Sequence, residues 1–264
     1  DSVKQSLQSD TQLVSIQLAN NEIGTIQPVK DIAMVIDAER KNRAEAGNNT
    51  PLFFHTDASQ GFGQIDVHTA RLGVDMLTLN SGKMYGPKQV GLLWCKPGVS
   101  IKAQIVGGGQ ERNLRSGTEN VAGVIGFAKA AELAEKHRHN ESDRLSTLRD
   151  SMQTQLCNAF PSAVVSGHPK KRLPGSLHIA FPDLDGERLI FRLERRGVLV
   201  ATGSACAANK GTRSHVLTAL GLPETIADGS LRITLGKLTQ ESDCTEATRI
   251  IIEEVAAEYE RIRS

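Results

Sequence analysis

The sequence predicts an α/β fold in which a mostly parallel sheet with helices is followed by a smaller C-terminal α+β domain. In the first half, short apolar runs alternate with a helical pattern, which is typical of parallel or mixed sheets. After the glycine run at residues 107–109, the pattern changes to a long helical stretch followed by short strands and further helices. We therefore expect two domains, spanning residues 1–125 and 126–264.

The first domain is expected to contain one long helix and four strands. Apolar side chains recur roughly at helical spacing in residues 29–45, at Ile32, Ala33, Val35, Ile36 and Ala38. Strands are predicted at residues 13–18, 52–54, 74–79 and 90–94. Polar residues follow the ends of three of these strands: Asn21, His55, Asp57, Gln60 and Lys83. Ligands of open α/β sheets bind beyond the carboxyl ends of strands, so we expect these side chains to form one site.

The second domain is expected to begin with a helical stretch over residues 118–160 that breaks near His139 and Asn140. Strands are predicted at residues 174–181, 198–200 and 231–235. Helices are predicted at residues 187–196 and 241–262, and another should begin near Ser214.

The composition excludes several classes of function. The 264 residues are 39% hydrophobic, which is enough for a sizeable core. The net charge of +1 provides no basic surface for nucleic acids or anionic membranes, and 4% aromatic residues provide no platform for stacking bases. No apolar run is as long as a membrane span, and the polar opening of the chain does not resemble a signal peptide. We expect no nucleic-acid or membrane partner.

The four cysteines are scattered along the chain, at Cys95, Cys157, Cys206 and Cys244. None belongs to a CxxC pair, so we expect no metal site. Isolated cysteines in a chain of this length fit a reducing compartment better than a disulfide framework.

Lys83 and Asp57 together predict pyridoxal phosphate (PLP) chemistry. Lys83 lies on a tight glycine-containing turn, and Asp57 ends the preceding apolar strand. PLP enzymes need a lysine to form a Schiff base with the cofactor and an acid to keep the pyridine nitrogen protonated. For Lys83 alone, the alternative is a surface lysine beside a turn.

Cys206 and Arg232 are candidates for the chemistry of the second domain. The neighbours of Cys206 are small and polar, which favours an accessible, reactive thiol over a buried one. Arg232 interrupts an apolar strand, and its guanidinium could bind a substrate carboxylate with two parallel hydrogen bonds. The alternative for Arg232 is an internal salt bridge.

Residues 107–118 form a glycine-rich loop that ends at Thr118, where a helix is expected to start. Backbone amides at such a position, with the Thr118 hydroxyl, could bind an anion such as phosphate. A helix cap explains Thr118 equally well.

Taken together, these residues make the chain resemble the cysteine desulfurases, which are class V aminotransferase-like, PLP-dependent enzymes of fold type I. The resemblance is strongest to the branch that serves iron–sulfur cluster assembly. It rests on segments that run in order through nearly the whole chain: residues 20–24, 55–60, 82–88, 107–112, 115–118, 174–177, 203–206, 216–221 and 231–232.

The resemblance implies a role for each candidate residue. Lys83 and Cys206 would be catalytic, and Asp57 would pair with the pyridine nitrogen. Asn21 and Gln60 would contact the phenolic oxygen of PLP, and Asn21 with Arg232 would bind L-cysteine. The products would be L-alanine and a persulfide on Cys206. That sulfur would pass to an acceptor or scaffold protein.

Thr118 would reach the PLP phosphate of a neighbouring subunit, which implies a homodimer. The family usually has a serine and a histidine at the positions of Asn80 and Gly82, where both help to hold the phosphate. We expect Ser81 to compensate in part for their absence.

Members of the family begin well upstream of Asp1, and the upstream part carries a ring-stacking histidine and a phosphate loop. We therefore expect residues 1–125 to be the C-terminal part of the PLP-binding large domain. An incomplete sheet would expose an edge that another chain covers.

The alternatives are a selenocysteine lyase, another class V enzyme such as an aminotransferase, or a catalytically incomplete fragment that acts through binding. A cytoplasmic location is expected, or a mitochondrial one in a eukaryote.

Overall fold

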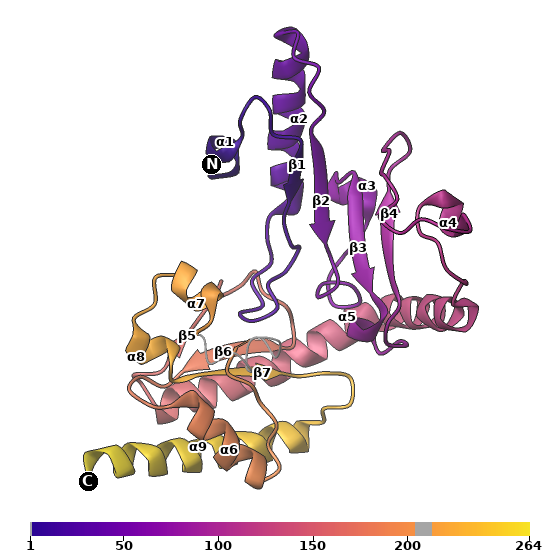
Figure 1. The fold of residues 1–264 in the computed structure, drawn as a ribbon. Coiled ribbons are helices and arrows are strands. Elements are labelled where there is room, and N and C mark those ends of the chain that lie inside the picture. The colour runs from indigo at the N-terminus through magenta and orange to yellow at the C-terminus, as the bar shows by residue number, and fades with distance from the viewer. Residues whose placement is uncertain (1, 204–212) are drawn as a thin grey trace. The chain divides into compact units, whose positions relative to one another are not determined.

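The computed structural model describes residues 2–203 and 213–264. Cys206 lies outside the described residues. The described part of the chain forms two compact units. The first comprises the described residues of Asp1–Leu18 and Gln27–Arg138, and the second those of Ala19–Ile26 and His139–Ser264 (Figure 1).

The first unit is built on a four-stranded sheet of order β1-β2-β3-β4. The strands are β1 (Leu13–Ser15), β2 (Phe53–Asp57), β3 (Met76–Asn80) and β4 (Gly91–Cys95). β1, β2 and β3 are parallel, and β4 is antiparallel to β3. The predicted mostly parallel sheet is confirmed. The helical elements are α1 (Ser2–Ser6), α2 (Val29–Glu45), α3 (Thr69–Leu72), the 3-10 helix η1 (Ser81–Met84), α4 (Gln110–Asn113) and the start of α5 (Val121–Ala159).

Helix α2 forms over the residues that its apolar spacing predicts. Ile32 and Ile36 lie one turn apart, so both face the sheet and pack in one cluster with Phe54 of β2 and Leu77 of β3. Side chains alternate along a strand, so the neighbours of Phe54, which include His55, point to the opposite face of the sheet. The face that carries Phe54 and Leu77 thus builds this core, and His55, Asp57 and Thr78 point to the other face.

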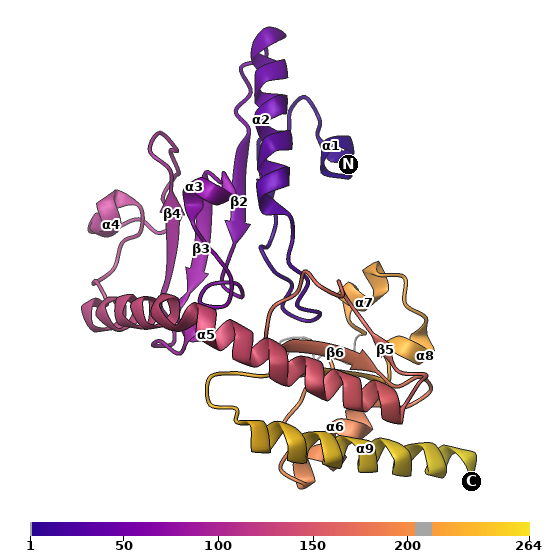
Figure 2. The same cartoon turned by 180° about the vertical axis from the view of Figure 1, so that it is seen from behind.

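The second unit contains a three-stranded antiparallel sheet of order β5-β6-β7. The strands are β5 (Val164–Val165), β6 (Ser176–Ala180) and β7 (Ser230–Thr234). The remaining helices are α6 (Gly186–Arg195), α7 (His215–Ala219), α8 (Glu224–Ala227) and α9 (Glu241–Arg263). The second half of α5 and helix α9 run along this sheet (Figure 2).

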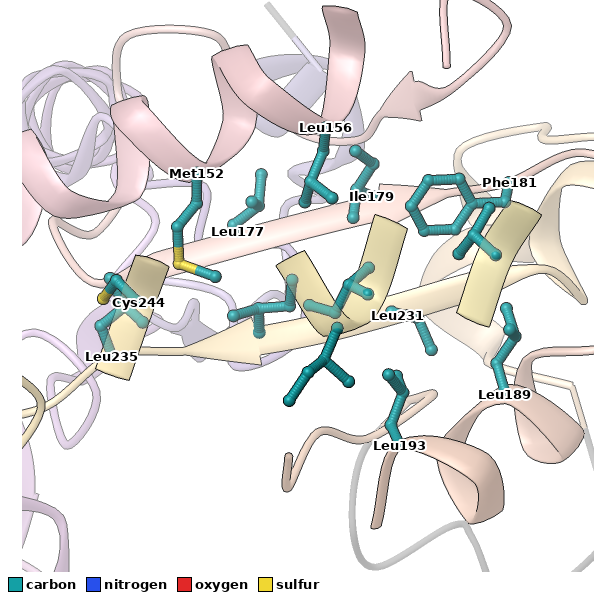
Figure 3. Packing of buried hydrophobic residues seen from close by; sticks show 14 of the residues in the cluster. Met152, Leu156, Leu177, Ile179, Phe181, Leu189, Leu193, Leu231, Leu235 and Cys244 are labelled. Carbon is teal, nitrogen blue, oxygen red and sulfur yellow. The ribbon is translucent and has the colours of Figure 1, made fainter. Parts of the chain in front are cut away.

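One face of the small sheet carries the core of the second unit. Met152 and Leu156 of α5 meet Leu177 and Ile179 of β6 there, and Leu231 of β7 belongs to the same cluster (Figure 3). Helices α6 and α9 contribute further apolar residues to this cluster. Because side chains alternate along each strand, the residues between these leucines and isoleucines point to the other face.

Two expectations about the second domain are wrong. Helix α5 runs without a break through His139 and Asn140. No proline occurs between residues 121 and 159, so nothing interrupts the helical hydrogen bonds. Residues 198–200 form no strand, and the pairing seen here among the described residues is a bridge between Ala201 and Arg232. Their apolar character serves the core, since Val198 and Val200 pack against it.

The division into units differs from the expected boundary at residue 125. The first unit extends along α5 to residue 138, and residues 19–26 belong to the second unit. Ile23 packs against Leu217 and Ala227, and the carbonyl of Gly24 accepts a hydrogen bond from the amide of Leu173 at 2.8 Å. These contacts attach residues 19–26 to elements much later in the chain.

Among the described residues, no helix is both long and apolar enough to cross a membrane.

Candidate active site

Asp57 and Lys83 lie at the same edge of the sheet in the first unit. Asp57 is the last residue of β2, and Lys83 lies in η1, directly after β3. β2 and β3 are parallel neighbours, and Asp57 pairs with Thr78. Both charged side chains are exposed. The structure therefore places the two residues predicted for PLP chemistry at the carboxyl ends of adjacent strands.

The turn that carries Lys83 is closed by local hydrogen bonds. The Asn80 side chain accepts a hydrogen bond from the amide of Gly82 at 2.9 Å. The carbonyl of Ser81 accepts hydrogen bonds from the amides of Tyr85 and Gly86. Tyr85 has a left-handed backbone with φ of 63°, which ends the short helix. Asn80 thus holds the turn where the family usually has a serine.

Ser81 is fully buried, and its hydroxyl has no hydrogen-bond partner in the described part of the chain. A Cβ atom added to Gly86 would lie 2.2 Å from Ser81 Oγ and 2.9 Å from Ala130 Cβ. The Ser81 hydroxyl therefore packs against the backbone of Gly86. Its role towards a phosphate stays a prediction.

A row of hydrogen-bonded polar side chains crosses the sheet beside Asp57. Ser15 Oγ lies 2.8 Å from His55 Nδ1, and His55 Nε2 lies 2.8 Å from Thr78 Oγ1. Burial lowers the pKa of His55, although the charge of Asp57 opposes this shift. The imidazole thus joins β1, β2 and β3 through its two ring nitrogens. The sequence predicted His55 near the site but not its hydroxyl partners, which only the strand register brings together.

The carboxylate of Asp57 has one oxygen engaged by the protein. Its Oδ1 accepts a hydrogen bond from the amide of Ser59 at 2.8 Å, which fixes the side chain at the start of the following turn. Gln60 lies in the same turn and is half-buried, and its carbonyl accepts a hydrogen bond from Gln64.

Unusual backbone conformations are concentrated in two predicted motifs of the first unit. Of six described non-glycine residues with positive φ, five lie at or next to the Lys83 turn and in the glycine-rich loop: Tyr85, Gln89, Glu111, Arg112 and Asn113. Such residues cost free energy and tend to cluster at active sites and ligand-binding segments. This signal supports a site at these two segments, and sequence reasoning did not provide it.

Thr118 lies on the exposed stretch between the glycine-rich loop and α5. The helix begins only at Val121, and the Asn120 side chain caps it by accepting a hydrogen bond from the amide of Gly123 at 3.0 Å. The cap is therefore Asn120, and Thr118 has no part in it.

Arg232 and Asn21 both belong to the second unit. Arg232 is half-buried on β7, opposite His178 of β6. No carboxylate in the described part of the chain forms an ion pair with Arg232, which removes the internal salt bridge as an explanation there. Asn21 is exposed in the turn that follows Asn20, whose side chain accepts hydrogen bonds from the amides of Glu22 and Ile23.

The three described cysteines, Cys95, Cys157 and Cys244, are not in disulfides. Burial raises the pKa of the Cys244 thiol, which makes it a poor nucleophile. The described residues contain no group of three or more histidine, cysteine or acidic side chains that could hold a metal ion.

The described residues fit PLP. An exposed carboxylate and an exposed amine stand at the ends of neighbouring parallel strands, as the pyridine nitrogen and the aldehyde of PLP require. Asp57 Oδ2 makes no hydrogen bond in the described part of the chain, so it is available to the pyridine nitrogen.

Comparison with known proteins agrees with this geometry. The sequence profile of the family described as "Aminotransferase class-V" matches residues 1–246. This chain belongs to the aminotransferase class-V family. Two similar relatives are the protein named cysteine desulfurase IscS 1 of Archaeoglobus fulgidus and cysteine desulfurase IscS of Dictyoglomus turgidum. They are 40% identical over 262 residues and 41% identical over 243 residues.

Two solved structures of NifS-like proteins have the same fold. A NifS-like protein matches with a TM-score of 0.84 and 34% identity over 97% of this chain. The NifS-like protein from Rickettsia africae matches with a TM-score of 0.83 and 27% identity over 98% of this chain. These matches confirm the α/β fold class expected for a PLP-dependent transferase.

The chain spans only part of each of these proteins. The match with the Archaeoglobus relative covers 99% of this chain and 64% of the relative. The match with the Dictyoglomus relative covers 92% of this chain and 59% of the relative. The chain covers 64% and 65% of the two solved structures.

Proposed function

We propose that this chain carries the active-site lysine, the acidic PLP partner and the nucleophilic cysteine of a cysteine desulfurase. The observation that carries the proposal is the placement of Asp57 and Lys83, both exposed, at the ends of adjacent parallel strands. The names of the two relatives at 40% and 41% identity favour desulfuration over other reactions of the class V family.

The cofactor would accept electrons, and side chains of the protein would bind the cofactor and transfer protons. PLP, when bound, would accept the electron pair that is released from the substrate carbon. Asp57 would hold a proton on the pyridine nitrogen through its free oxygen. Gln60 and Asn21 would contact the phenolic oxygen of the ring, and Ser81 would contribute to the phosphate site. The Lys83 amine would attach the cofactor and move protons at the substrate.

The remaining residues would bind and desulfurate L-cysteine. Arg232 would hold the substrate carboxylate through two parallel hydrogen bonds, with Asn21 beside it. The Cys206 thiolate would attack the substrate sulfur, so that an S–S bond forms as the C–S bond breaks. The substrate carbon would take up a proton and leave as L-alanine. Cys206 would keep the sulfur as a persulfide.

Further parts of the proposal concern partners and location. The persulfide would pass to an acceptor or scaffold protein of iron–sulfur cluster assembly. Thr118 would contact the PLP phosphate of a second subunit, which makes the active form a homodimer. The location would be cytoplasmic, or mitochondrial in a eukaryotic source.

The test is to add PLP and L-cysteine to the chain and to measure L-alanine release together with the mass of the Cys206 peptide. We expect alanine and one added sulfur atom on Cys206. Cys206→Ser should lose both, whereas Cys157→Ser, which changes another free cysteine, should lose neither. Release of alanine from L-selenocysteine but not from L-cysteine would indicate a selenocysteine lyase. No release from either would indicate a fragment that acts through binding.

A further inference from the structure

His178 lies in the middle of β6 and has Arg232 of β7 as its register partner. Its neighbours Leu177 and Ile179 both point into the core of the second unit. His178 therefore points to the opposite face of the sheet. Leu231 and Ile233 flank Arg232 in the same way, so Arg232 shares the face of His178.

The backbone hydrogen bonds show that these two side chains are close. The Arg232 amide donates a hydrogen bond to the Ala201 carbonyl at 2.5 Å, and the Arg232 carbonyl accepts one from the Ala201 amide at 3.2 Å. Both backbone groups of Arg232 therefore point away from β6. The carbonyl of His178 accepts a hydrogen bond from Ser166, also away from β7. His178 and Arg232 are thus a non-hydrogen-bonded pair, the kind in which facing side chains approach closest, with Cβ atoms about 4.5–5.5 Å apart.

The imidazole of His178 is buried without a hydrogen-bond partner in the described part of the chain. The residue is 1% exposed, and neither ring nitrogen has a hydrogen-bond partner in the described part of the chain. A buried polar group without a partner costs free energy, and native structures keep few of them. Nothing in the packing of the described residues accounts for a histidine rather than an apolar residue at this position.

In the described part of the chain, the charge that acts on the His178 ring comes from β7. The neighbouring strand β5 consists of Val164 and Val165, so it brings no titratable side chain to His178. On β7, Arg232 is the charged group that acts on the ring. Burial first, and the charge of Arg232 second, lower the pKa of His178 to about 4, so the ring is neutral at neutral pH.

We propose that His178 is a positioning residue that keeps Arg232 free for a carboxylate ligand, and that proton binding at His178 is coupled to carboxylate binding at Arg232. An acid opposite Arg232 would form an internal salt bridge and compete with the ligand, whereas a neutral ring does not. A bound carboxylate offsets the charge of Arg232, so a proton on His178 becomes less costly. Coupling between two binding sites is reciprocal. The proposed function enters only in naming the ligand as the carboxylate of L-cysteine.

The test uses 3-mercaptopropionate, which has the carboxylate and thiol of L-cysteine but no amino group to react with PLP. The ring of His178 in the whole chain is titrated by NMR with and without this compound. We expect the midpoint, near 4 in the free chain, to rise by about one unit on saturation, a roughly tenfold gain in proton affinity. Arg232→Gln should raise the midpoint without ligand and remove the effect of the ligand.

A second experiment measures the affinity of two histidine variants for 3-mercaptopropionate. His178→Glu should weaken 3-mercaptopropionate binding at least about tenfold, because the new carboxylate pairs with Arg232. His139→Gln, which changes an exposed histidine of α5, should bind like the unchanged chain. A midpoint that responds neither to the ligand nor to Arg232→Gln would overturn the proposal. Since the probe is not a substrate, this result is independent of whether the chain desulfurates L-cysteine.

Discussion

The carboxylate of Glu22 accepts a hydrogen bond from the hydroxyl of Ser214 at 2.5 Å. Glu22 is 2% exposed, and Ser214 precedes the first residue of α7. The same hydroxyl accepts hydrogen bonds from the amides of Val216 and Leu217, so it caps the helix. Ser214 thus links residues 19–26, which include Asn21, to the first turn of α7. In sequence, α7 follows the segment that contains Cys206.

Ser214→Ala should lower the free energy of unfolding by about 1–2 kcal/mol, because it removes the cap of α7 and leaves the buried Glu22 carboxylate without its partner. Urea denaturation would measure this loss. Thr245→Ala is a suitable control, since Thr245 is exposed and, among the described residues, its hydroxyl donates only to the Glu241 carbonyl one turn earlier. Equal stability of the two variants would contradict the assignment.

His178 should make the chain less stable as the pH falls. Its pKa is about 4 in the folded chain against a usual value of 6.5, so the unfolded chain binds more protons between these values. The associated stability is complete above pH 6.5, declines as the pH falls, and is lost below pH 4. This amounts to about 3 kcal/mol. The free energy of unfolding of His178→Gln, measured against pH, should lack this decline. The same pH dependence in His178→Gln and the unchanged chain would show that His178 does not titrate in this range.

Gly86→Ala should destabilise the Lys83 turn by about 1–3 kcal/mol, since the added methyl group would meet Ser81 Oγ at 2.2 Å and Ala130 Cβ at 2.9 Å. Removing the hydroxyl in the double variant Ser81→Ala/Gly86→Ala should restore part of the loss. Gly203→Ala is the control, because its new Cβ would have ordinary contacts at 3.6 Å. Thermal denaturation of these three proteins, of Ser81→Ala and of the unchanged chain would check this. A loss in the double variant equal to the sum of the losses in Ser81→Ala and Gly86→Ala would argue against the contact.

Asp57→Asn should reduce alanine formation on the order of 100-fold while the chain stays folded. The amide oxygen can still accept the hydrogen bond from Ser59, but an uncharged side chain no longer holds a proton on the pyridine nitrogen. Asp66→Asn, which changes an exposed acid paired with Arg71, should leave the rate unchanged. A rate in Asp57→Asn close to that of the unchanged chain would mean that Asp57 does not pair with the cofactor.

Local patterns in the sequence predicted much of the fold. The apolar spacing gave the bounds of α2, and the apolar runs gave the four strands of the large sheet and placed Asp57 and Lys83 at strand ends. Features that depend on long-range contacts could not be predicted. The apolar run at residues 198–200 packs in the core without forming a strand, and the attachment of Ile23 to Leu217 joins segments far apart in the sequence. The pairing of His178 with Arg232 follows only from the register of β6 and β7.

The most direct test of the account is to reduce the PLP-treated chain with borohydride, which fixes the cofactor to the lysine that holds it, and to identify the labelled peptide by mass spectrometry. The account predicts label on Lys83, with none on the exposed Lys88 of the same loop and none anywhere in Lys83→Ala. Label on another lysine, or an unlabelled Lys83 under saturating PLP, would contradict the proposed active site.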